Sequence, residues 1–124
     1  MNDKGTKAAL LAHARAAARS LANSVTNAQS RAGVCLDLLS DIGTDPSLEA
    51  FRKVLRTLPA DERHYWIGTL YTLLLPTKVR RRQATYFTPP TVADAVIDLA
   101  IDAGFDLGTD TVLDPAAGGA AFLS

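Results

Sequence analysis

The chain has 124 residues, of which 48% are hydrophobic and 21% are charged, and its formal net charge is zero. These values are ordinary for a globular protein with one modest core, and they exclude a surface that is basic throughout. The longest apolar run, at residues 70–75, is too short to span a membrane. The single cysteine, Cys35, excludes an intramolecular disulfide, so we expect a cytoplasmic protein; no Cys and His cluster predicts a metal site.

The charges are unevenly distributed along the chain. Up to residue 35 there are five basic residues and one acid, and a dense basic run follows later. Its members are Lys78, Arg80, Arg81 and Arg82. After Arg82 there is no Lys or Arg, whereas six aspartates occur. The basic run either lies on solvated surface or contacts DNA phosphates, and the sequence leaves both interpretations open.

Residues 6–32 are predicted to form one helix. Small and aliphatic side chains recur there at steps of three and four residues, and they define one apolar stripe: Leu10, Leu11, Ala14, Ala18, Leu21, Val25, Ala28 and Ala32. Such an Ala-rich, acid-poor start is also the composition of a transit peptide, but a plain helix of high propensity is the interpretation that we favour. After Gly33, a second helical piece is predicted to end at Gly43.

Prolines mark the next two helices. Thr44 or Asp45 before Pro46 is a helix-start signal, because a capping oxygen precedes a residue whose φ suits the first turn. This helix is predicted to end at Pro59, with an apolar face formed by Leu48, Phe51, Val54, Leu55 and Leu58. Asp61 is predicted to cap the following helix, which runs to about residue 75 and stops at Pro76, and the basic run is predicted to lie in a loop.

A further helix is predicted to begin after Pro90 and to stop at Gly104. Its buried face is predicted to comprise Val92, Val96, Leu99 and Ala100, and its solvated face Asp94, Asp98 and Asp102. The β-branched stretch at residues 111–114 is the best strand candidate in the chain.

Two short segments point to a ligand. In "YFTPPTVADAV", residues 86–96, Thr88 and two prolines precede a helix whose free amides suit a carboxylate. In "LDPAAGGAAFLS", residues 113–124, an acid opens into a Gly-rich turn that lets the backbone approach a ligand. Each segment alone is better explained by ordinary structure, the first by a capped helix and the second by a tightly packed turn.

Together, in this order and at this spacing, the two segments resemble the N6-adenine DNA methyltransferases of restriction–modification and related phage-defence systems. That family has a Y-F/Y-T-P-x-x-V-A segment before its first strand and a D-P-A-C-G-S-G-x-F-L loop after it. The matching residues are Tyr86, Phe87, Thr88, Pro89, Val92 and Ala93, and then Asp114, Pro115, Ala116, Gly118, Phe122 and Leu123. The lead-in, with Gly68, Tyr71, Leu74 and Arg82, also looks like that family. Ala120 departs from it, because the family has glycine there.

The resemblance implies binding of S-adenosylmethionine. Thr88 and Pro89 would help to seat the methionine end of the cofactor, and Tyr86 and Phe87 would pack near it or fill core. The other side of the cofactor would be lined by Asp114, Pro115, Ala116, Gly118 and Gly119. The family's catalytic N/D-P-P-Y/F loop does not occur in the sequence, so we expect no methyl transfer by this chain alone.

These observations predict a mainly α protein with two regions. Residues 1–82 would form a helical bundle, and residues 83–124 would begin an incomplete Rossmann-like α/β methyltransferase domain with its first helix and strand. The expected function is the N-terminal part of an adenine-specific DNA methyltransferase, with DNA and a downstream half or specificity subunit as partners. The alternative is a non-enzymatic helical module that docks on a restriction–modification subunit or on DNA.

Overall fold

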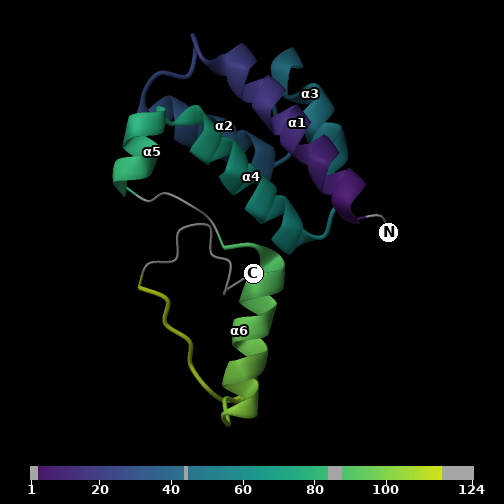
Figure 1. The fold of residues 1–124 in the computed structure, drawn as a ribbon, viewed down its shortest axis with the longest axis vertical. Helices are drawn as coiled ribbons and strands as arrows, with labels where there is room; N and C mark the ends of the chain where they lie inside the picture. The colour runs from purple at the N-terminus through teal and green to yellow at the C-terminus, as the bar shows by residue number, and fades with distance from the viewer. Residues whose placement is uncertain (1–2, 44, 84–87, 116–124) are drawn as a thin grey trace.

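The computed structural model describes residues 3–43, 45–83 and 88–115, and every regular element in these ranges is a helix (Figure 1). The helices are α1 (Asp3–Leu21), α2 (Ala28–Leu39), α3 (Pro46–Leu55), α4 (Ala60–Leu74), α5 (Thr77–Gln83) and α6 (Pro90–Asp102). The described chain is therefore mainly α, as the sequence predicts. The predicted start of a Rossmann-like α/β domain is wrong, because its strand is absent from the described residues.

The predicted strand at residues 111–114 is irregular chain. Its two largest apolar side chains are exposed, Val112 at 49% and Leu113 at 86%. A strand is stable only when neighbouring strands take its hydrogen bonds and cover one of its faces. No described segment pairs with these residues, so their β-branched composition does not produce a strand.

Helices α1–α4 form a bundle around one core. α1 packs against α3 and α4, and α2 packs against α4. α1 contributes Leu10, Ala14, Ala17 and Leu21, at the helical spacing that places them on one face. The bulkiest core residues come from α3 and α4: Leu48, Phe51, Leu55, Trp66, Ile67 and Leu70. The small alanines of α1 let it approach the larger side chains of its neighbours closely.

The single helix predicted for residues 6–32 is wrong, because the chain leaves the helical path between α1 and α2. Asn27 begins α2 with an extended backbone, and its Oδ1 accepts a hydrogen bond from the Ser30 amide at 2.8 Å. In return the Ser30 hydroxyl accepts from the Asn27 amide at 3.2 Å, which completes a capping box. The break turns α2 away, so Ala28 and Ala32 are exposed rather than part of the core stripe.

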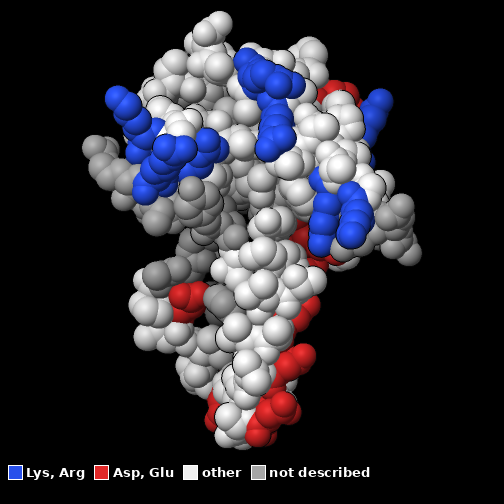
Figure 2. All heavy atoms as spheres, viewed as in Figure 1, with Lys and Arg blue, Asp and Glu red and all other residues white. Residues whose placement is uncertain are grey.

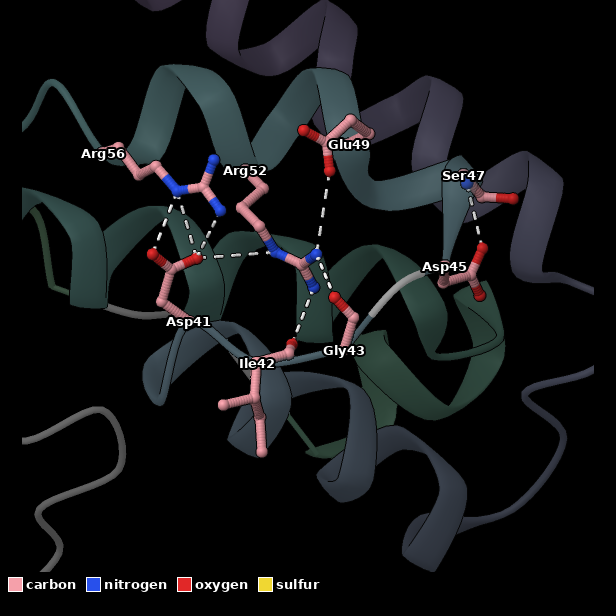
Figure 3. Close-up of polar contacts among 8 residues, drawn as sticks. All are labelled: Asp41, Ile42, Gly43, Asp45, Ser47, Glu49, Arg52 and Arg56. Carbon is pink, nitrogen blue, oxygen red and sulfur yellow. Dashed lines mark hydrogen bonds and ion pairs between the residues drawn. The ribbon is translucent and has the colours of Figure 1, made fainter.

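The α2–α3 connection is closed by Arg52 (Figure 3). Its side chain is buried, and it donates to the carbonyl oxygens of Ile42 at 2.9 Å and Gly43 at 2.7 Å. Asp41 lies 3.7 Å from Arg52 Nε and accepts hydrogen bonds from Arg56 at 2.9 Å. Ile42 and Gly43 are exposed, whereas Arg52 is buried, so its two hydrogen bonds tie the exposed connection to α3. The Arg56 hydrogen bond, with the nearby guanidinium charges, lowers the pKa of Asp41.

The start of α3 confirms the prediction from sequence. Asp45 is its N-cap and accepts a hydrogen bond from the Ser47 amide at 2.9 Å, and Pro46 occupies the first turn. Gly43, just before it, has a φ of +97°, a conformation that favours glycine.

The end of α4 also confirms its prediction, but the segment after it does not. Leu75 is extended and Pro76 follows, so the helix stops where expected. The N-cap of α4 is Pro59, without a side-chain cap, and Asp61 instead accepts a hydrogen bond from the Glu62 amide at 2.9 Å. The predicted basic loop is helix α5, in which the Arg80 amide bonds to the Pro76 carbonyl at 3.0 Å.

Helix α6 extends away from the bundle, and its main helical contact is with α4 (Figure 1). It begins at Pro90 as predicted, and Gly104, with a φ of +106°, follows its end. The predicted buried face is wrong, because Val92, Val96, Leu99 and Ala100 are exposed. Ala93 is the buried residue of this helix. The amphipathic pattern is present, but no described element covers its apolar side.

Candidate functional site

The predicted cofactor segments are described only in part. Tyr86 and Phe87 lie outside the described residues, as do Ala116, Gly118 and Gly119. The described members are Thr88 and Pro89 before α6, and Asp114 and Pro115 after it. The predicted convergence of the two segments depends on the Gly-rich turn and therefore falls outside the described residues.

Among the described residues, the first turn of α6 leaves one backbone amide without a hydrogen-bond partner. Pro90 has no N–H, and the carbonyl of Pro89 accepts from the amides of Val92 at 3.0 Å and Ala93 at 3.1 Å. Pro89 is the N-cap and supplies no side-chain cap, and Thr88 beside it is half-buried. Among the described residues, the Thr91 amide has no hydrogen-bond partner. The sequence predicted several free amides here, and the geometry reduces this set to one.

After α6 the chain reverses through a compact turn. Asp106 accepts a hydrogen bond from the Gly108 amide at 2.8 Å, and Asp110 accepts one from the Asp106 amide at 2.8 Å. Residues 105–115 then run back along the long axis of the molecule toward the level of the first turn of α6 (Figure 1). Asp114, at the end of this run, is half-buried, and Pro115 is exposed.

A second site, which the sequence did not predict, is a pocket of about 370 Å³ between α4 and α5. The wall from α4 consists of Tyr65, Thr69, Thr72 and Leu73. These positions fall on one face because their spacing follows the helical period. The Tyr65 ring meets Trp66 edge to face, with ring centroids 5.4 Å apart, so a core residue supports this wall.

The opposite wall comes from the basic run. It consists of Thr77, Arg80 and Arg81, again at helical spacing. Arg80 is half-buried and donates to the Thr72 carbonyl and to the Thr77 hydroxyl, each at 3.4 Å. Lys78 and Arg81 are exposed, and Arg82 belongs to the same helix. Among the described residues, neither Arg80 nor Arg81 forms an ion pair.

Charge is distributed unevenly along the molecule. The visible Lys and Arg side chains lie on the bundle, one group of them over α5, whereas acidic side chains follow the far part of α6 (Figure 2). All 13 basic residues belong to residues 1–82, together with seven of the 13 acids. The two ends of the molecule therefore attract ligands of opposite charge.

The pocket was missed because its residues looked unremarkable separately. Neither Thr69 nor Thr77 belongs to a motif, and the sequence predicts a loop for Arg80 and Arg81. The available signal was the helical spacing of Thr77, Arg80 and Arg81 directly after Pro76. In the ranges that the structure describes, no three His, Cys, Asp or Glu side chains are grouped to hold a metal ion, and no helix is long and apolar enough to cross a bilayer.

Comparisons of the chain with protein-family models, curated proteins and solved structures found no match. The resemblance to adenine-specific methyltransferases therefore rests on the motif residues themselves.

Proposed function

We propose that this chain supplies the S-adenosylmethionine-binding segments of an adenine-specific DNA methyltransferase, which transfers the methyl group of the cofactor to adenine N6. The observation that carries the proposal is the ordered pair of motifs at residues 86–93 and 114–123, which are separated by the rest of helix α6 and the turns that follow it. The sequence holds no N/D-P-P-Y/F loop, so the catalytic loop has to come from outside these residues and the chain alone is inactive.

The described donor and acceptor groups suit the methionine end of the cofactor, which carries a carboxylate and an ammonium group. The Thr91 amide and the Thr88 hydroxyl are donors at a helix N-terminus, where negative charge is favoured. The carboxylate of Asp114 is an acceptor that suits the cationic groups. When bound, the cofactor would supply the methyl group, while these residues would fix its orientation.

A second candidate function is a non-enzymatic helical module that docks on a restriction–modification subunit or on DNA. The observation that favours it is the exposed apolar face of α6, where Val92, Val96 and Leu99 are 50%, 45% and 68% exposed. A docked protein would remove this surface from water.

Isothermal titration calorimetry with S-adenosylmethionine separates the two functions. We expect binding by the 124-residue chain, weakened about tenfold by Asp114→Asn or Thr88→Val, each of which removes one polar contact of about 1.4 kcal/mol. Asp98→Asn, on the exposed side of α6, is the matched control and should leave the affinity unchanged. Equal weakening by all three variants, or no binding, would contradict the proposal. Transfer of a radiolabelled methyl group to DNA by the chain alone would contradict its assigned inactivity.

A further inference from the structure

We propose that the pocket between α4 and α5 binds a nucleotide unit, with its phosphate on Arg80, Arg81 and Thr77 and its base against Tyr65. The proposal is independent of the methyltransferase function, because the pocket shares no residue with the cofactor segments. It also goes beyond a general attraction of the basic run for DNA, since it assigns a pocket with separate places for phosphate and base.

The α5 wall provides phosphate donors. A guanidinium has five N–H groups, and Arg80 uses two contacts of 3.4 Å that hold it beside the end of α4. Its remaining donors and those of Arg81 suit phosphate oxygens, which guanidinium groups bind with a matching planar fork. The Thr77 hydroxyl accepts from Arg80 and keeps its own hydrogen for a phosphate oxygen.

The α4 wall has the complementary chemistry. The hydroxyl of Thr69 donates to the Tyr65 carbonyl and that of Thr72 to the Gly68 carbonyl, each at 3.0 Å. Each hydroxyl has a single hydrogen, so these two threonines offer the pocket acceptor lone pairs and methyl groups but no donor. Acceptors of this kind suit the exocyclic amino group of a nucleobase.

The size and the apolar surfaces suit an occupant larger than a bare phosphate. The pocket of about 370 Å³ has roughly the volume of a dozen water molecules of about 30 Å³ each, far more than one phosphate fills. Tyr65 and Leu73 provide an aromatic and an aliphatic surface, and contact of a base with an aromatic ring contributes about 1–3 kcal/mol. A phosphate attached to a flat base uses both walls.

The test uses the full chain and three probes: adenosine 5′-monophosphate, inorganic phosphate and a short single-stranded oligodeoxynucleotide. Arg81→Ala should weaken binding of the nucleotide probe about tenfold through loss of a charge-assisted contact. Lys78→Ala is the matched control, because Lys78 carries the same charge on the same helix but does not line the pocket. It should weaken binding less than about twofold. Arg81 is exposed, so its replacement leaves the fold intact.

Thr69→Val tests the base compartment, because it keeps the side-chain volume and removes an acceptor. It should weaken the nucleotide about threefold and leave the weak binding of inorganic phosphate unchanged. Binding of the mononucleotide identifies a free nucleotide as ligand, and binding of the oligonucleotide alone, with the same dependence on Arg81, identifies a unit within a strand; both support the proposal. Equal effects of Lys78→Ala and Arg81→Ala, phosphate bound as tightly as both nucleotide probes, or no binding at all would overturn it.

Discussion

At the scale of single residues, Arg52 is the charged side chain that is buried in the described part of the chain. Buried arginine is rare unless it is paired, and here Nη1 and Nη2 donate to two carbonyl oxygens in the connection between α2 and α3. Two acids, Asp41 and Glu49, lie within 4 Å of the guanidinium group. The arrangement is a hydrogen-bonded support for a loop, and neither proposed ligand site includes it.

Replacing Arg52 should therefore destabilise the whole bundle. We expect Arg52→Met to lower the free energy of unfolding by about 2–3 kcal/mol, because two carbonyl oxygens lose a charged donor. Arg52→Lys should recover only part of this loss, since an ammonium group cannot bond both carbonyls with the same planar geometry. Urea denaturation followed by circular dichroism measures the change. Lys53→Met, exposed on the same helix, is the control, and an equal effect of both methionine variants would refute the role of Arg52.

Because the pKa of Asp41 is shifted in the folded protein, we expect the stability of the protein to depend on pH. Its pKa in the folded protein is lowered from 3.8, mainly by the Arg56 hydrogen bond. The stabilisation is therefore complete above the ordinary pKa and is lost as the pH falls through the lowered folded value. Near neutral pH the melting temperature of the wild type should be higher than that of Asp41→Asn, and this difference should vanish in strong acid. Asparagine tolerates the φ of +51° at this position, so the comparison isolates the charge. A difference in melting temperature that persists in strong acid would contradict a role for the Asp41 charge.

At the scale of elements, the break between α1 and α2 depends on Asn27. Its capping box satisfies amides that would otherwise lack partners, and it fixes where α2 begins. We expect Asn27→Ala to lower the free energy of unfolding by about 1 kcal/mol and Asn27→Ser to restore most of it. Gln29→Ala, at an exposed position in the same turn, should have little effect. If Asn27→Ala leaves urea unfolding unchanged, the two helices are separated by another cause.

Helix boundaries that depend on local chemistry could be predicted from the sequence. Asp45 with Pro46, Pro76, Pro90 and Gly104 act on their own backbone, and each boundary lies where expected. The break at Asn27 was hidden because the alanine stripe continues across it, and alanine suits buried and exposed positions alike. The strand at residues 111–114 failed because its stability depends on neighbours that a propensity cannot supply.

The candidate sites were predictable to different extents. The cofactor segments were found because their residues are adjacent in the chain and follow a known order. The pocket lies between α4 and α5, on either side of Pro76, so it depends on how the two helices pack. A sequence motif does not contain this information. The same holds for α6: the periodicity of its sequence identifies an apolar face but does not show whether another element covers that face.

At the scale of the molecule, α6 buries far less of its surface than α4 does. Ala93 is its buried residue, whereas α4 buries Trp66, Ile67 and Leu70. We expect hydrogen-exchange mass spectrometry to show fast exchange for amides at 94–102 and slow exchange in α4, because local opening of α6 exposes little apolar surface. The bundle helix α1 in the same sample is the internal control. Equal protection of α6 and α4 would mean that another contact holds α6 in solution.

The separation of basic and acidic side chains along the longest axis has an electrical consequence (Figure 2). Although the net charge is zero, the protein has a dipole moment, with its positive pole on the bundle and its negative pole on α6. In dilute buffer this moment favours head-to-tail encounters between copies. At physiological ionic strength the Debye length of about 8 Å is shorter than α6, at about 1.5 Å for each residue, so an approaching molecule senses one pole at a time.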